Sequence, residues 1–101
     1  MDMLMKNFCE FIDGADAVEL RYKTESCGVT RVNVEAVFQG DEFDDDGLAI
    51  NPRFVTRRLG FANRAAAEEV LAGMRGALVA LKFYNEYSDS DGGWSIETFC
   101  R

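Results

Sequence analysis

Two runs of alternating apolar and polar residues most constrain the fold, because a period of two sends one face of each run toward a core. The first run is Ala17 to Glu25 and the second is Thr30 to Gln39, with the short loop Ser26-Cys27-Gly28 between them. A short glycine-containing loop between such runs predicts an antiparallel hairpin. Its predicted inward residues are Val18, Leu20, Tyr22 and Thr24, then Thr30, Val32, Val34, Ala36 and Phe38.

Two other segments have helical spacing. Near the N-terminus, apolar residues recur every three or four positions and end at Asp13-Gly14, which predicts a short amphipathic helix. Asn63 is a candidate N-cap for a second, major helix over Arg64 to Glu86. Its glycines, Gly73 and Gly76, predict close packing against a sheet. The expected apolar stripes are Leu4, Met5, Phe8, Phe11 and Ile12 in the first helix, and Ala67, Val70, Leu71, Met74, Leu78 and Leu81 in the second.

Two weaker strand signals complete the pattern. Arg53 to Gly60 alternates imperfectly, which is typical of a strand that is at an edge, bulged or covered on both faces. The turn signal Ser88 to Gly93 precedes a last alternating run, Trp94 to Phe99. The order α-β-β-β-α-β predicts an α+β fold in two layers: a mainly antiparallel four-stranded sheet with one long helix across a face and a short N-terminal helix.

Length and composition indicate one globular domain over residues 1–101. The chain is 48% hydrophobic despite a net charge of −7, which is too apolar for a disordered chain. No apolar run approaches the ~20 residues that a membrane span requires. The N-terminal residues lack the basic and apolar regions of a secretory signal, so we expect a cytoplasmic protein without a membrane partner.

The chain contains no His, which removes the usual general base and the commonest metal ligand. Its three cysteines, Cys9, Cys27 and Cys100, lack the C-x-x-C spacing of zinc and redox sites, so reduced thiols are expected. Cys27 is the best candidate for an exposed thiol, but the neighbouring Glu25 carboxylate would oppose formation of a thiolate. We therefore predict a protein that is not an enzyme and uses no cofactor.

The most unusual segment is Gly40 to Leu48, in which five carboxylates surround one phenylalanine. As an EF-hand loop it would place Glu42, Asp44 and Asp46 at ligand positions one, three and five, before Gly47 at the sixth. The twelfth position is Arg53 instead of the required Glu, so no calcium site of this kind is expected. A weak, nonspecific divalent site and a simply solvated, mobile loop are the alternatives.

Charge is distributed unevenly along the chain. Residues 1–52 hold 12 Asp and Glu against 4 Lys and Arg, whereas residues 53–101 hold 6 against 7. Closely spaced carboxylates resemble a phosphate backbone, so they suit a basic groove and would repel nucleic acid itself. Phe43 either anchors such an interface or packs into the core. The predicted partner-binding residues are Asp41, Glu42, Phe43, Asp44, Asp45 and Asp46.

A basic cluster, Arg53, Arg57, Arg58 and Arg64, offers a second hypothesis. Near the start of the long helix it could form a small phosphate- or nucleotide-binding module. We instead expect these arginines to pair with the acidic stretch, which is only a few residues away in the sequence. A third possibility is a structural or assembly subunit that pairs through a sheet edge.

The favoured prediction is a non-enzymatic inhibitor or adaptor whose acidic surface binds a basic, nucleic-acid-binding protein. Small size and excess acid make the chain similar to phage-encoded inhibitors of host defence, including anti-CRISPR proteins. This is a resemblance of type that rests on no motif. It favours the inhibitor hypothesis without naming a target.

Overall fold

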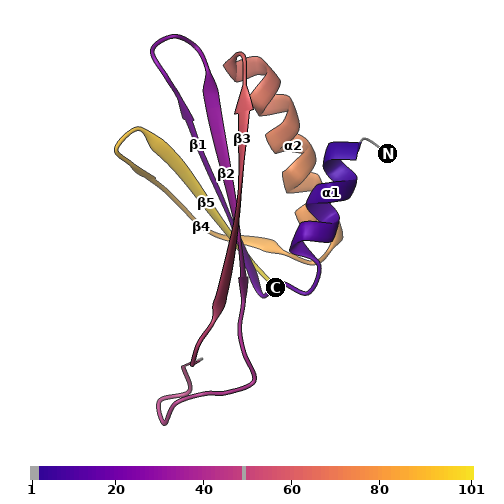
Figure 1. Cartoon of the computed structure of the whole chain (residues 1–101), viewed down its shortest axis with the longest axis vertical. Helices are drawn as coiled ribbons and strands as arrows, with labels where there is room; N and C mark the ends of the chain where they lie inside the picture. The colour runs from indigo at the N-terminus through magenta and orange to yellow at the C-terminus, as the bar shows by residue number, and fades with distance from the viewer. Residues whose placement is uncertain (1–2, 49) are drawn as a thin grey trace.

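The computed structural model of the chain describes residues 3–48 and 50–101 (Figure 1). Two helices and five strands follow in the order α-β-β-β-α-β-β, so the α+β class is confirmed and the predicted count of four strands is wrong by one. The elements are α1 (Met3–Ile12), β1 (Ala17–Thr24), β2 (Thr30–Phe38), β3 (Arg53–Phe61), α2 (Arg64–Ala80), β4 (Tyr84–Asp91) and β5 (Trp94–Cys100).

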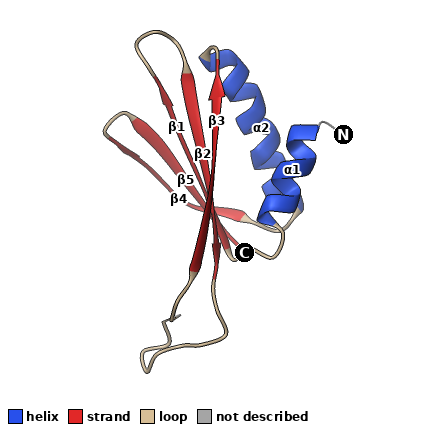
Figure 2. Cartoon of the chain, in the orientation of Figure 1, coloured by secondary structure: helices blue, strands red, loops and turns tan. Residues whose placement is uncertain are grey.

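All five strands form one antiparallel sheet in the order β3-β2-β1-β5-β4. Both helices lie on the same side of this sheet, so the molecule has the predicted two layers (Figure 2). Helix α2 packs against β2 and β3, and α1 packs against α2. None of the helices in the described part of the chain is long and apolar enough to cross a membrane.

The core lies between the sheet and the two helices. The predicted hairpin is confirmed, with Val18 opposite Ala36 and Leu20 opposite Val34, all four side chains buried. Helix α1 contributes Phe8 and Ile12 to this core, as its spacing predicted. Helix α2 contributes the larger part of its predicted stripe, namely Ala67, Leu71, Met74 and Leu78.

The opposite face of the sheet carries no helix. Because side chains alternate along each strand, residues next to the core positions point to this uncovered face. They include Arg21 of β1, Asn33 of β2, Arg58 of β3 and Ile96 of β5, which lie in one row across the sheet. Ile96 is buried and yet lies outside the core cluster, so neighbouring side chains cover it without a second layer of helices.

The sequence prediction failed after α2. The helix ends at Ala80 rather than near Glu86, and Lys82 has a φ of +70°, a left-handed conformation that stops the helix. The chain then forms β4, and the two-residue turn Gly92-Gly93 joins it to β5. Strand β4 escaped prediction because it is an edge strand exposed at every position, and so has no buried face to impose a pattern.

Details of α2 partly follow the prediction. The Asn63 side chain caps the helix by accepting a hydrogen bond from the Ala66 N–H at 2.9 Å. Leu81 follows the last helical residue and is exposed, so its place in the buried stripe was wrong. Gly73 permits close approach of Met5 from α1, not of the sheet, since a Cβ there would lie 3.2 Å from the Met5 sulfur. Gly76 faces open space, so close packing does not explain it.

One ion-pair network ties α2 to the sheet on the helix-covered side. Arg75 of α2 donates two hydrogen bonds to the Glu97 carboxylate of β5, at 2.8 and 2.6 Å. The Tyr22 hydroxyl of β1 donates to the same carboxylate at 2.7 Å. The Arg75 hydrogen bonds hold the pKa of Glu97 below its ordinary value, and burial together with the Glu97 contact raises the pKa of Tyr22. This network connects three elements.

The thiols give a first testable prediction. Cys9, Cys27 and Cys100 are free and lie on α1, in the β1–β2 loop and at the end of β5. A reducing agent should leave the melting temperature unchanged in a thermal scan followed by circular dichroism, because no disulfide restrains the unfolded chain. A fall in stability of about 2–4 kcal/mol on reduction, the usual contribution of a disulfide, would contradict the free-thiol assignment.

Candidate functional site

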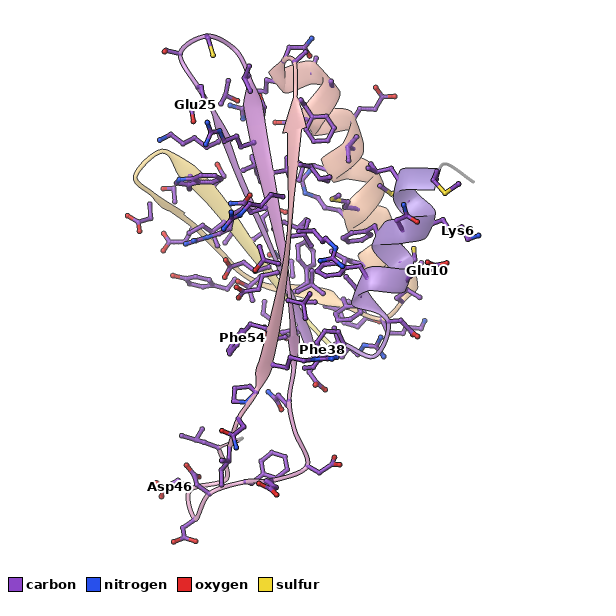
Figure 3. The ribbon with its side chains drawn as sticks, in the orientation of Figure 1. Lys6, Glu10, Glu25, Phe38, Asp46 and Phe54 are labelled. Atoms are coloured by element: carbon purple, nitrogen blue, oxygen red, sulfur yellow. The ribbon has the colours of Figure 1, made fainter. Side chains whose placement is uncertain are left out.

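The acidic stretch lies in the connection between β2 and β3, which extends beyond the end of the sheet (Figure 1). We call residues 40–48 and 50–52 the acidic tip. Figure 3 shows Asp46 at its far end, whereas Glu25 lies at the opposite end of the molecule. The tip contributes to an elongated shape, 48 Å in its longest extent and 19 Å in its shortest. The structure therefore presents the five carboxylates away from the body.

The backbone of the acidic tip is hydrogen-bonded across itself. The Ile50 N–H donates to the Glu42 carbonyl at 2.9 Å, and the Asp44 N–H donates to the Leu48 carbonyl at 2.8 Å. The Asp44 carboxylate accepts the N–H groups of Asp46 at 2.9 Å and Leu48 at 2.8 Å, as turn-forming Asp side chains do. Asp44 thus shapes the turn as well as adding charge to it.

The carboxylates themselves face solvent. All five acidic residues of the tip are exposed, and within the described residues none forms an ion pair with an Arg or Lys. No described Arg or Lys side chain therefore neutralises their charge. The tip holds five negative charges and no positive one between Gly40 and Pro52. A cationic partner would meet all of that charge.

Apolar side chains lie among the acids. Phe43 is 54% exposed and outside the core, so the alternative in which it packs into the core was wrong. Leu48 and Ile50 are 66% and 41% exposed on the same tip. Sequence reasoning missed these two residues, although two aliphatic residues between an acidic run and Pro52 were a detectable signal. Charge and apolar area are combined on one projection.

The predicted pairing between the arginine cluster and the acidic stretch is wrong. Arg53 lies over the Phe38 ring at 4.5 Å, and Arg57 lies over the Phe11 ring of α1 at 5.0 Å. Arg64 pairs with Glu68 one turn along α2, at 3.1 Å. Arg58 points to the uncovered face of the sheet, since it alternates with Arg57. The cluster is dispersed over two faces of the sheet and a helix, so its four members do not form one phosphate site.

No set of three or more potential metal ligands converges in the part of the chain that the structure describes. In the acidic tip, one Asp44 oxygen already accepts two backbone N–H groups, and that role is structural. The residues that the EF-hand alignment placed at ligand positions therefore do not surround a common point. What the tip does offer is an exposed surface that is both anionic and apolar.

These features define a small two-layer α+β protein with an unpaired acidic projection and an uncovered sheet face. Comparison of the chain with protein-family models, with curated proteins and with solved structures found no match. Both edge strands carry charged side chains, Arg53 and Arg57 on β3 and Glu86 and Asp89 on β4. Charged edges discourage pairing with further strands.

Proposed function

We propose that this protein is a non-enzymatic inhibitor or adaptor that binds a basic protein through the acidic tip. The observation that carries the proposal is the projection of five unpaired carboxylates around the exposed Phe43. A charged loop is usually only a solvated surface, but this one also exposes three large apolar side chains close together. Phe43, Leu48 and Ile50 give this tip an apolar contact area.

The two components of the tip have different roles in binding. Unpaired carboxylates attract a cationic surface over a distance comparable to the Debye length, so they accelerate encounter. Exposed apolar side chains add contact energy once the surfaces meet, and aromatic residues are frequent hot spots of interfaces. The cross-tip hydrogen bonds reduce the entropy that binding must remove, because they already hold the backbone in one arrangement.

The chemistry of the tip favours one class of partner. A groove that binds nucleic acid is lined with Arg and Lys to match phosphates, and a row of carboxylates presents similar negative charge. Occupation of such a groove by the tip would exclude nucleic acid. The proposed partner is therefore a basic, nucleic-acid-binding protein, and the proposed effect is competitive.

A capture experiment with two matched variants tests this proposal. Phe43→Ser removes the aromatic side chain of the tip, while Phe54→Ser removes an equally exposed phenylalanine from the body of the sheet, 58% exposed. Loss of a hot-spot aromatic typically costs about 2 kcal/mol or more, so Phe43→Ser should weaken binding roughly thirtyfold. The wild type and Phe54→Ser should capture the same protein and retain it equally well.

Competition then distinguishes the proposed mechanism from general stickiness. Duplex DNA or RNA should release the captured protein, because tip and nucleic acid would share one groove. Equal retention by all three chains would argue against a role for the tip. A partner that nucleic acid does not displace would contradict the competitive effect while leaving the tip as an interface.

A further inference from the structure

The uncovered face of the sheet holds a hollow that the acidic tip does not explain. Its volume is about 430 Å³, and its lining residues are Arg31, Asn33, Arg58, Leu59, Gly60 and Trp94. Trp94 comes from β5, and β1 lies between β5 and β2 in the sheet. Its indole must therefore extend across β1 to line the same hollow as Arg31 and Arg58. One aromatic residue and two arginines therefore line the same hollow.

The local charge is opposite to that of the chain as a whole. The side chain of Arg58 makes no hydrogen bond, ion pair or ring contact with another described residue, and neither does the side chain of Lys23 on β1, the strand next to β2. Arg31 has only a long contact with Glu25, 3.6 Å between Nε and Oε1, and both side chains are substantially exposed. Exposed pairs of that kind contribute little, so Arg31 remains open to an anionic ligand.

Gly60 opens the floor of this hollow. It lies opposite Arg31 in the β2–β3 register, and a Cβ at this position would meet no atom within 4 Å. Asn33 lies opposite Arg58 in the same pair of strands and supplies an amide with both donor and acceptor atoms. The hollow thus combines a stacking surface, two planar cations, an amide and free space.

We propose that this hollow binds one nucleotide, with its phosphate between Arg31 and Arg58 and its base against Trp94. Guanidinium groups bind phosphate oxygens through paired hydrogen bonds, and an indole stacks on any base. The volume lies within the usual range of small-ligand sites. This site differs from the arginine cluster predicted from the sequence, of which it uses Arg58 alone, and it does not depend on the acidic tip.

A mononucleotide suits the surroundings better than a nucleic-acid strand. Trp94 is the only tryptophan in the chain and offers a stacking surface for a single base. Asp91 lies opposite Trp94 on the neighbouring strand, Asp89 lies opposite Ile96, and the chain carries a net charge of −7. Successive phosphates of a strand that left the hollow toward β4 would meet these carboxylates. One phosphate can stay on the arginine side.

Trp94 makes the site directly measurable, because the intrinsic tryptophan fluorescence of the protein comes from this residue alone. Titration with AMP, CMP, GMP and UMP should quench it for at least one nucleotide, with Kd below about 1 mM. Arg58→Gln should raise that Kd about tenfold, because a charge-assisted contact is lost. Arg64→Gln removes the same charge from α2 and should leave Kd unchanged.

Gly60→Val provides an uncharged test of the same hollow. The open space around Gly60 and the β-branched side chain allow the strand to form, so circular dichroism should match the wild type while binding is lost. The proposal is overturned if none of the four nucleotides quenches, if Arg64→Gln weakens binding as much as Arg58→Gln, or if Gly60→Val binds normally.

Three further measurements identify the occupant. Inorganic phosphate and a free nucleoside should each compete much more weakly than the nucleotide. If either one competed as strongly as the nucleotide, the site would not need both a phosphate and a base, which would contradict the proposal. A ten-nucleotide single strand that binds more tightly than the mononucleotide would replace the proposal with a strand-binding face. Trp94 emission that varies with protein concentration would instead show that a second copy of the chain covers this face, which would contradict the nucleotide site.

Discussion

Association with the captured partner should slow at least about tenfold at low salt when Asp41, Asp45 and Asp46 are replaced by Asn, because the steering charge falls. At about 10 mM ionic strength the Debye length is about 30 Å, so the whole tip acts on an approaching cation. At about 1 M the Debye length is about 3 Å, and the wild type and the triple variant should then associate with the partner at similar rates. Stopped-flow or surface-based kinetics over a salt series measures this convergence.

This choice of residues comes from the structure. Asp44 is left unchanged because its carboxylate accepts two backbone hydrogen bonds that shape the tip. Folding should be preserved, since changes at solvated surface positions usually alter stability by less than about 0.5 kcal/mol. A triple variant that associates as fast as the wild type at low salt would show that the tip is only a solvated loop.

A matched control separates local from overall charge. Glu10, Asp13 and Glu69 are exposed acids outside the acidic tip, and replacing them by Gln, Asn and Gln changes the net charge equally. If only overall charge matters, the control should slow association as much as the tip variant. The proposed function requires the control to behave like the wild type.

The second large effect should appear in stability. Glu97→Gln is expected to lower the free energy of unfolding by about 2 kcal/mol at neutral pH, since it removes charge-assisted hydrogen bonds to Arg75 in a largely buried setting. The Glu97 side chain is 15% exposed and that of Arg75 is 33% exposed. For a domain of about 100 residues, this loss corresponds to a fall of roughly 10 °C in melting temperature.

Acid should remove the difference in the free energy of unfolding between the wild type and Glu97→Gln. The pKa of Glu97 in the folded protein lies below its ordinary value of 4.5, so the carboxylate contributes fully at pH values above that value. As the pH falls below 4.5 and through the folded pKa, the wild type takes up a proton and loses this contribution. Urea unfolding of both proteins at a series of pH values follows the change.

Glu68→Gln serves as the comparison for this prediction. It removes the exposed Arg64–Glu68 pair, which should be worth less than about 0.5 kcal/mol. Equal destabilisation by the two substitutions would mean that burial of the Glu97 network adds nothing. A difference between wild type and Glu97→Gln that persists undiminished at pH 3 would contradict the pKa shift.

For the hairpin and for β4, the outcome of the sequence prediction depended on whether one face of the segment is buried. The hairpin of β1 and β2 was predictable because burial of Val18, Leu20 and Val34 imposes a strict alternation. Strand β4 is exposed throughout, so nothing in its sequence had to alternate and it was assigned to a helix and a turn. The end of α2 was missed because a buried apolar residue beyond the helix continued the apolar pattern. Phe83 is buried like the helical stripe, although the helix has already ended at Ala80.

For the candidate site, the sequence alone determined the composition of the acidic stretch, the absence of His and the alternation that makes an antiparallel sheet. Side-chain direction and distant contacts were left to the tertiary structure. Arg57 and Arg58 are adjacent in the chain, yet the pleat of β3 sends one to Phe11 and the other to the uncovered face. Trp94 and Arg31 line the same hollow only because the sheet brings β5 close to β2, with β1 alone between them. Local patterns report burial and period, whereas the meeting of residues far apart in sequence depends on strand order, which local patterns do not encode.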